Sequence, residues 1–310
     1  MESIKIISPG LLTTVQDAGR FGMFAYGLPP SGAMDQYSYQ IGNILVGNPR
    51  NAAALETTLQ GLKVEFLRKT TVALTGADPA PRLNSEKAPL WRSFSVEPGD
   101  TLSFGTAQKG LRSYLCIHGG LDVEEVLGSR STFVRGGIGS VLKKDDTLET
   151  PMCDECGKYA GRNLPARYIP PYEEEPVIRV LPGPQADYFT DKGLATFYGS
   201  TYCLSIYADR QACRTEGPAI EIEKGPGIIT DPIPTGSIQV PGDGLPIILL
   251  RDCQITGGYA KIAIVTKVDL DRVGQLRPGD KIRFKRIDRM AALKLWGEQK
   301  ELLNRIEDSV

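Results

Sequence analysis

The stretch PGDTLSF at residues 98–104 returns as PGDKIRF at residues 278–284. In both copies Pro-Gly is typical of a tight turn. After the aspartate, polar and apolar residues alternate as they do along a β-strand with one buried face. Pro-Gly-Asp turns are common, but a turn-and-strand unit that recurs late in the chain is consistent with two related β units.

Short β-branched and apolar runs separated by turn residues continue outward from these two copies. The chain has 34 glycines and 22 prolines, and residues of these types between such runs mark turns. No regular long helical segments lie between the strands, as a doubly wound α/β fold would require. We therefore expect a mainly β protein. The clearest runs are KII at 5–7, TVAL at 71–74, PVIRV at 176–180 and IILL at 247–250.

Two segments favour helices instead. The first follows Asp35, a suitable N-cap, and stops before Gly47, which suits the position after a helix end. Its apolar residues fall on one helical face: Tyr37, Ile41, Ile44 and Leu45. The second runs from about residue 288 to the end, where Glu301 and Arg305 form a favourable i,i+4 pair.

The length of 310 residues suits two domains better than one. The stretch 162–176 is rich in proline and acidic residues and is the candidate linker. We therefore place one domain at 1–170 and a second at 171–310, the latter carrying the C-terminal helix.

Composition and charge exclude several classes of protein. Lys plus Arg total 36 and Asp plus Glu total 37, so the basic excess of a nucleic-acid binder is missing. No apolar run approaches the roughly 18 residues that span a bilayer. The N-terminus MESIKIISPG lacks the features of a signal peptide. We expect a cytoplasmic protein that binds neither nucleic acid nor membrane.

Metal and nucleotide motifs are also missing. Cys153 and Cys156 form a CxxC, but no second ligand pair accompanies them, so we expect no metal site. The only histidine, His118, stands where a strand enters a glycine turn, which favours a structural role. The sequence contains no GxxxxGK[ST], GxGxxG, HExxH or GxSxG.

Three segments combine glycines with polar side chains. They are 9–20 with 31–35, then 239–246, and 251–261. Glycines let the backbone approach a ligand closely, and Gln, Asp, Arg and Lys supply oriented donors and acceptors. The pattern favours a small polar substrate with carbonyl or carboxylate groups.

These segments carry a resemblance to a known family. PGLLTTVQDAGRFG, SGAMDQYS, NILVGNP and LETTLQG resemble the N-terminal signature of the KipA family, and IQVPGDGLPIILLRDCQITGGYAKIA resembles its C-terminal signature. RVLPGPQ at 179–185 and LGSRST at 127–132 also match, so the resemblance covers nearly the whole chain. The family is also described as allophanate hydrolase subunit 2 and as subdomains A and B of the biotin-dependent carboxyltransferase domain.

The resemblance implies two cyclophilin-like β-barrel domains with a few helices. It implies the C subunit of an ATP-dependent 5-oxoprolinase, which converts 5-oxo-L-proline to L-glutamate only beside a KipI-like B subunit and a LamB/YcsF-like A subunit. Two alternatives stay open: a KipA-type regulatory protein that antagonises a kinase inhibitor, and a carboxyltransferase component that uses carboxybiotin. Without a P-loop, ATP would bind at a site shared with a partner subunit. No Met-Lys-Met-type segment offers a lysine for biotin, so this chain should carry none.

Some positions depart from the family pattern. Residues 208–217 read ADRQACRTEG where the family commonly shows SDRMGYRLEG, and QITGGY at 254–259 replaces QTTGGY. Gly139-Ser140 stands where a Gly-Arg is usual. A different substrate or a reduced activity therefore stays open.

From these segments we assign candidate roles. Asp252 is the candidate general base or orients a water, and Lys261 or Arg20 would bind a substrate carboxylate or phosphate. The remaining candidates for substrate binding are Gln16, Ser31, Gln239, Asp243, Gln254 and Tyr259. We expect the 9–35 and 239–261 loops to converge on one cleft.

Each role has a structural alternative. Asp35 favours a helix cap over a catalytic role. Asp17 and Arg20 could pair with each other, and Asp243 could only shape its Gly-Asp-Gly turn. Asp252 and Lys261 could form a buried ion pair.

Overall fold

The structure is a computed structural model that describes residues 2–151 and 157–310. The chain forms two compact units. The first contains residues 1–21, 31–172 and 302–310, and the second contains residues 22–30 and 173–301. The linear division into 1–170 and 171–310 stays a prediction.

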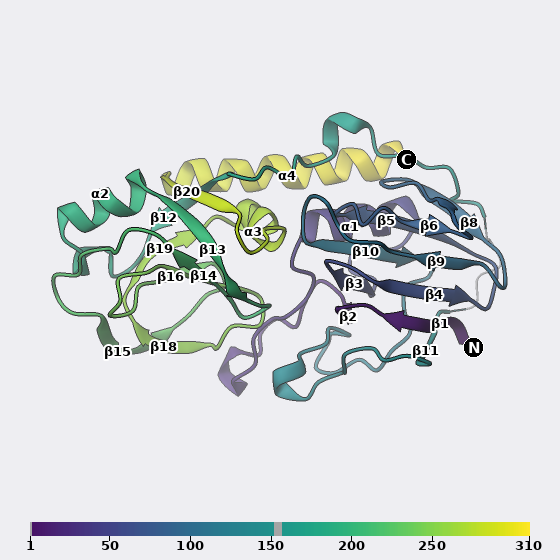
Figure 1. Cartoon of the computed structure of the whole chain (residues 1–310), viewed down its shortest axis with the longest axis horizontal. Helices are drawn as coiled ribbons and strands as arrows, with labels where there is room; N and C mark the ends of the chain where they lie inside the picture. The colour runs from purple at the N-terminus through teal and green to yellow at the C-terminus, as the bar shows by residue number, and fades with distance from the viewer. Residues whose placement is uncertain (1, 152–156) are drawn as a thin grey trace. The chain divides into compact units, whose positions relative to one another are not determined.

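The first unit is built on two antiparallel sheets (Figure 1). The six-stranded sheet has the order β11-β1-β4-β9-β6-β7, and its strands are β1 (Glu2–Pro9), β4 (Leu62–Phe66), β6 (Arg82–Leu83), β7 (Glu86–Lys87), β9 (Thr101–Ser103) and β11 (Thr147–Glu149). The five-stranded sheet has the order β2-β3-β10-β5-β8, and its strands are β2 (Leu12–Gln16), β3 (Ala54–Thr58), β5 (Thr70–Gly76), β8 (Ser93–Val96) and β10 (Arg112–Ile117).

Strand β10 shows how the first unit divides its core. Leu115 and Ile117 join the cluster that also holds apolar residues of the six-stranded sheet. Tyr114 and Cys116, which alternate with them, pack instead with the buried face of α1 (Gln36–Leu45). A fully buried strand therefore contributes to two cores, because successive side chains point to opposite faces of a sheet.

The second unit contains a closed seven-stranded barrel with the order β12-β19-β16-β17-β14-β13-β20. The closing pair β12 and β20 is parallel, with Val180 opposite Arg286. The barrel strands are β12 (Val177–Pro182), β13 (Thr201–Ala208), β14 (Ala212–Glu216), β16 (Ser237–Gln239), β17 (Ile247–Leu249), β19 (Lys261–Val265) and β20 (Lys281–Arg286). A separate two-stranded sheet pairs β15 (Gly227–Pro232) with β18 (Thr256–Tyr259).

The two expected helices are confirmed. Helix α1 begins after Asp35, whose carboxylate accepts the Ser38 N–H at 2.9 Å, and Gly47 follows its end at φ 73°. Helix α4 covers Arg289–Ser309. Sequence patterns did not predict α2 (Asp191–Gly199) or α3 (Lys267–Gly274), which span only two or three turns. Short 3-10 helices complete the described elements: η1 (Phe24–Tyr26), η2 (Val134–Gly136), η3 (Ala166–Tyr168) and η4 (Ala186–Tyr188). The expected mainly β fold with a few helices is confirmed.

The repeated Pro-Gly-Asp turn has the same geometry in both units. Gly99 and Gly279 have φ 87° and 92°, as the third residue of a type II turn requires. The carboxylate of Asp100 accepts the Glu97 N–H at 2.7 Å, and that of Asp280 accepts the Arg277 N–H at 2.8 Å. The turn glycine donates to the preceding partner strand in each case, Gly99 to Phe66 at 2.7 Å and Gly279 to Leu204 at 2.8 Å. The sequence repeat therefore marks equivalent turns that lead into β9 and β20.

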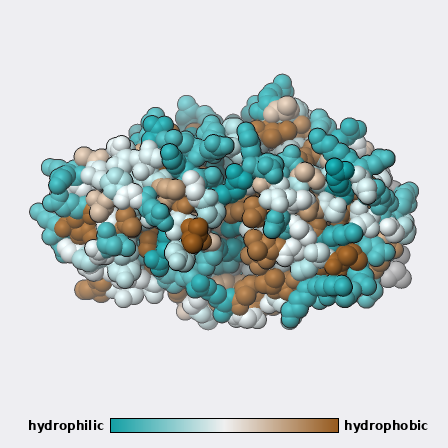
Figure 2. Space-filling view, in the orientation of Figure 1, coloured by the Kyte–Doolittle hydropathy of each residue, from teal (hydrophilic) through white to brown (hydrophobic). Residues whose placement is uncertain are grey.

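On the face drawn in Figure 2, hydrophobic residues occur in small groups among hydrophilic ones. The described residues include exposed apolar side chains such as Ile206, Tyr207, Ile229 and Met290. No helix in the described ranges combines the length and the hydropathy that a membrane crossing needs.

Candidate functional site

The carboxylate of Asp17 organises one end of the first unit. It accepts the Gly19 N–H at 2.8 Å, the Ser129 hydroxyl at 2.7 Å and the Arg130 N–H at 2.6 Å. The Ser131 hydroxyl donates to it as well. A carboxylate with this many donors is fixed in place, so Asp17 ties the loop after β2 to residues 129–131.

Arg20 binds the same stretch from the other direction. Its guanidinium donates to the carbonyls of Val126 at 2.9 Å, Ser131 at 3.1 Å and Ser129 at 3.3 Å, and the side chain is 1% exposed. The predicted anion-binding group is thus engaged with backbone carbonyls inside the first unit. Asp17 and Arg20 therefore both form hydrogen bonds to residues within 126–131. This is a structural role, and it involves more partners than an ion pair between the two side chains would.

Gln16 and Ser31 each carry a buried oxygen with no hydrogen-bond partner among the described residues. The Gln16 amide donates to Thr14 Oγ1 at 3.0 Å and to the Thr132 carbonyl at 3.1 Å, which leaves its Oε1 unsatisfied. Ser31 is fully buried at φ 51°. An unsatisfied buried polar atom typically costs about 1–3 kcal/mol, so these two oxygens are candidates for contact with a small polar ligand.

Gly32 keeps Ser31 close to the loop after β2. A Cβ on Gly32 would lie 2.8 Å from both the Ala18 carbonyl oxygen and the Gly19 Cα, and the residue has φ 87°. Only glycine fits this contact. The structure therefore brings the predicted residues of the 9–35 segment together within the first unit.

In the second unit, the Lys261 ammonium is the most deeply buried of the predicted groups. It is 1% exposed and lies 2.5 Å from Asp231 Oδ2, with the Pro232 carbonyl at 3.2 Å. The hydrogen bond from Lys261 holds the pKa of Asp231 below its usual range. The buried Lys261 side chain therefore ends in a charge-assisted hydrogen bond to a carboxylate that reaches the surface of the unit.

Gln239 and Tyr259 lie beside this lysine. Gln239 faces Lys261 in the β16–β19 register, and its amide donates to the Tyr259 carbonyl at 3.1 Å. A Cβ on Gly257 would lie 3.2 Å from the Gln239 Nε2, so a small residue is needed there. Gln239, Tyr259 and Lys261 therefore form one cluster, in which two of the three polar segments meet.

Asp252 does not pair with Lys261 but with another cation of the second unit. Its carboxylate forms a buried pair with Arg210, at 2.8 Å from Nε and 3.3 Å from Nη2. The alternative in which Asp252 pairs with Lys261 is wrong, because Lys261 pairs with Asp231 instead. Asp252 is held by a bidentate guanidinium, an arrangement that fixes the position of the carboxylate.

Asp243 and Gln254 are exposed. Asp243 accepts the Leu245 N–H at 3.0 Å, which is the turn-shaping role open to it. Gln254 accepts a hydrogen bond from the Gln211 side chain at 2.8 Å. Their assignment to substrate binding stays a prediction. Convergence of the 9–35 and 239–261 loops also stays a prediction; residues 9–21 and 31–35 belong to the first unit, and residues 22–30 belong with 239–261 to the second.

Other residues have structural contacts. Asp35 caps α1, and the His118 Nδ1 donates to the Val46 carbonyl at 2.6 Å. Cys153 and Cys156 lie outside the described residues. Within the described ranges, no three His, Cys, Asp or Glu side chains are grouped as metal ligands.

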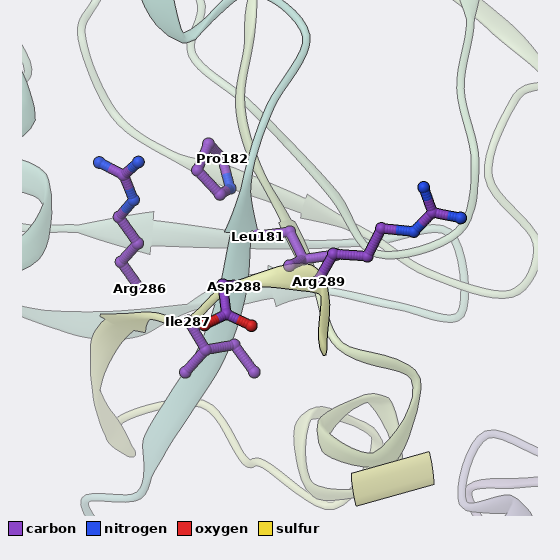
Figure 3. A pocket seen from close by; sticks show the side chains of 6 residues that line it. All are labelled: Leu181, Pro182, Arg286, Ile287, Asp288 and Arg289. Atoms are coloured by element: carbon purple, nitrogen blue, oxygen red, sulfur yellow. The ribbon is translucent and has the colours of Figure 1, made fainter. Parts of the chain in front are cut away.

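A pocket of the second unit lies where β12 and β20 end (Figure 3). Figure 3 shows the Arg286 and Arg289 side chains extending in different directions, with Pro182 and Leu181 between them. None of the residues predicted from the sequence lines it. The Asp288 carboxylate in this pocket accepts the Ala291 N–H at 2.8 Å and caps α4. We therefore consider a separate candidate site in each unit rather than this pocket: Gln16 with Ser31 in the first unit (the Gln16 cluster), and Lys261 with Gln239 and Tyr259 in the second (the Lys261 cluster).

Sequence reasoning missed two residues of the Lys261 cluster. Asp231 is the counterion of Lys261, and the Gln185 side chain accepts the Lys261 backbone N–H at 3.2 Å and donates to Asp231 at 3.4 Å. Gln185 ends the RVLPGPQ motif, which was a usable signal. Asp231 stands in no recognised motif, and only the pairing of β15 with β18 brings it to Lys261.

Comparison with known proteins gives the family. Residues 26–286 match the model of the carboxyltransferase domain, subdomain A and B. The chain belongs to this family. A protein of Escherichia coli K12, named as the C subunit of 5-oxoprolinase, is 35% identical over 98% of this chain and 97% of its own length. A protein of the same name from Haemophilus influenzae is 33% identical over the same shares of both chains.

Larger relatives contain a similar segment. A urea amidolyase of Lachancea kluyveri is 34% identical over 99% of this chain but only 18% of its own length. The solved urea amidolyase of K. lactis superposes with a TM-score of 0.93 at 31% identity, over 99% of this chain and 20% of that chain. The K. lactis urea carboxylase gives the same TM-score over 29% of that chain. Family membership and fold are thus established, and the relatives are of two kinds.

Proposed function

We propose that this chain is the C subunit of an ATP-dependent 5-oxoprolinase, which converts 5-oxo-L-proline to L-glutamate. The observation that carries the proposal is the 35% identity to nearly the whole of a 5-oxoprolinase C subunit. The chain aligns with 97% of the Escherichia coli C subunit but with only 18% of a urea amidolyase. The alignment therefore accounts for nearly all of the C subunit, and the naming of that relative as one subunit of an enzyme supports the proposal of partners. We propose a KipI-like B subunit and a LamB/YcsF-like A subunit as these partners.

The chemistry sets what the residues must do. A lactam is stabilised by amide resonance, and phosphorylation of its carbonyl oxygen by ATP makes the ring carbon more electrophilic. Water then adds at that carbon, the ring C–N bond breaks and the nitrogen takes a proton. With hydrolysis of the phosphoryl group, 5-oxoproline, ATP and two waters give glutamate, ADP and phosphate. The protein must therefore position the ring and stabilise negative charge.

Each cluster, taken by itself within its own unit, supplies groups suited to one of these tasks. Lys261 offers a buried ammonium for a carboxylate or phosphoryl oxygen, and Gln239 lies beside it. Gln16 offers a carbonyl oxygen that can accept the lactam N–H. In this proposal Asp252 is a positioning residue: its carboxylate holds the Arg210 guanidinium in place. ATP would bind at a site shared with a partner subunit, and no biotin is attached to this chain.

Reconstitution tests the proposal. The chain is purified with its candidate A and B subunits, and ATP-dependent release of glutamate from 5-oxo-L-proline is measured. We expect release only when all three subunits and ATP are present. The matched control replaces this chain by the C subunit of Escherichia coli. Release with that protein but not with this chain would reject the proposal.

A carboxyltransferase component is the second candidate, because the family model describes a carboxyltransferase domain and one similar solved structure is a urea carboxylase. The same preparation is incubated with carboxybiotin and urea, and loss of the carboxyl group from biotin is measured. Transfer that needs no ATP, together with absent glutamate release, would favour this candidate.

A further inference from the structure

Among the described residues, one short segment supplies both oxygen acceptors of the Lys261 ammonium. Asp231 Oδ2 lies at 2.5 Å and the Pro232 carbonyl at 3.2 Å, and both residues belong to β15. The Lys261 side chain is 1% exposed, whereas the Asp231 side chain is 41% exposed. A single movement of β15 would therefore remove both acceptors from a lysine that is otherwise enclosed.

The strand that carries Asp231 is weakly held. It pairs with β18 in a two-stranded sheet, and its register shifts between Gly227 and Asp231. Ile229, between these two points, is 95% exposed. Two-stranded sheets are marginal in water without further packing. In Figure 1 the β15–β18 pair forms an edge of the second unit.

The lysine is anchored independently of that strand. The Gly183 N–H donates to the Ile262 carbonyl at 2.9 Å, and the Gln185 N–H donates to the Lys261 carbonyl at 3.3 Å. A Cβ on Gly183 would lie 2.1 Å from the Lys261 carbonyl oxygen, so this contact needs glycine. Residues 183–185 and the barrel strand β19 therefore hold Lys261 in place when β15 moves.

We propose that Asp231 is a specificity-determining residue that occupies the anion position on Lys261 in the free chain, and that the anionic group of the substrate displaces it. The displaced position takes a carboxylate or a phosphoryl group, because either matches the charge and the hydrogen bonding of Asp231. A neutral ligand gains nothing from the exchange. The identity of the substrate rests on the proposed function, whereas the exchange at Lys261 does not.

The test compares Asp231→Asn with the wild-type chain, using three probes in calorimetric titrations. The probes are 5-oxo-L-proline, inorganic phosphate and the uncharged 5-oxo-L-prolinamide. Asn is isosteric but competes less well for an ammonium, so the fraction of chains ready to bind an anion rises. We expect affinity for the two anions to increase about fivefold or more, in proportion to that fraction, and affinity for the amide to stay unchanged.

Asp187→Asn is the matched control. Asp187 pairs with Lys224 at 2.6 Å in the same unit, both side chains are exposed, and the substitution changes net charge equally. It should leave the affinities for all three probes unchanged. Lys261→Gln should lose anion binding, with near-ultraviolet circular dichroism used to check that this variant is folded.

A second readout is hydrogen exchange in the wild-type chain. Phosphate should speed exchange of the 227–232 and 256–259 amides if it releases β15. Equal anion affinities in Asp231→Asn and the wild type, or no binding of any probe to either, would overturn the proposal. A lower thermal midpoint of Asp231→Asn without a change in affinity would show a purely structural pair and overturn it too.

The two proposals fail separately. Tighter phosphate binding to Asp231→Asn, together with glutamate release by the Escherichia coli C subunit but not by this chain in the reconstituted complex, would keep the exchange and reject the 5-oxoprolinase function. Glutamate release by the reconstituted complex, with equal anion affinities in Asp231→Asn and the wild type, would keep the 5-oxoprolinase function and reject the exchange.

Discussion

Asp252 and Arg210 are each about nine-tenths buried or more, and their bidentate contact decides what a substitution at either does. Removing one partner deprives the other buried charge of this bidentate contact, and breaking a buried ion pair is strongly destabilising. The sequence predicts that Asp252 is a general base or orients a water. The geometry instead makes Asp252 a structural partner of Arg210 first.

We expect Asp252→Ala to lower the free energy of unfolding by about 3–5 kcal/mol, measured by urea denaturation. The double variant Arg210→Met/Asp252→Leu should recover part of this loss, because it removes both charges. If Asp252→Ala unfolds like the wild type yet abolishes turnover of the reconstituted complex, the direct catalytic role returns.

Buried thiols give a second prediction for single residues. Burial raises the pKa of Cys253 to about 12 and raises that of Cys116 further. Because the thiolate is the reactive form, iodoacetamide at pH 8 should label partly buried Cys203 before either of them. Peptide mapping before and after unfolding in urea measures this order. Rapid labelling of Cys116 in the native chain would contradict the packing of α1 on β10.

At the scale of elements, two helix glycines should respond in opposite ways to alanine. A Cβ on Gly42 in α1 would lie 2.5 Å from Cys116 Sγ and 2.9 Å from Thr75 Oγ1, whereas one on Gly297 in α4 would meet nothing within 4 Å. We expect Gly42→Ala to destabilise by about 1–3 kcal/mol through overpacking. Gly297→Ala should stabilise by roughly 0.5–1 kcal/mol through helix propensity. Urea unfolding of both variants checks the two signs, and equal effects would contradict them.

The repeated turns give a paired prediction. Gly99 and Gly279 both have positive φ, and a Cβ on either would meet nothing within 4 Å. Alanine at each should therefore cost only backbone strain, about 1–2 kcal/mol. Thermal unfolding of Gly99→Ala and Gly279→Ala measures the two costs. A much larger cost at one turn would show that the two are not equivalent.

For the whole molecule, stability should fall in acid. Hydrogen bonds from Lys224 and Lys261 hold the pKa values of Asp187 and Asp231 below their usual range. Groups of this kind stabilise the fold above their unfolded pKa of about 3.9, and the contribution is lost as pH falls through the lower folded value. Burial raises the pKa of Asp280, which acts in the opposite direction: its contribution is present below the unfolded pKa and lost as pH rises.

We therefore expect the urea midpoint to fall from about pH 5 downward, and to fall less in Asp187→Asn/Asp231→Asn than in the wild type. Parallel acid limbs in the two proteins would show that these pairs do not set the dependence. The opposing contribution of Asp280 is absent from Asp280→Asn, so the difference between the urea midpoints of this variant and the wild type over the same pH range measures it.

What the sequence determined by itself is local. Asp35, the apolar face of α1 and Gly47 predict a helix because each depends on neighbours within a few turns, and the two Pro-Gly-Asp turns predict strands for the same reason. The short helices α2 and α3 escaped prediction because eight or nine residues hold too few periods of the helical pattern.

Only the tertiary structure decided which charges meet. Lys261 meets Asp231 across 30 residues, and Asp252 meets Arg210 across 42. No local pattern encodes these pairs, since strand pairing and barrel closure choose the partners. Burial then fixes the choice, because a charge removed from water needs a partner at hydrogen-bonding distance.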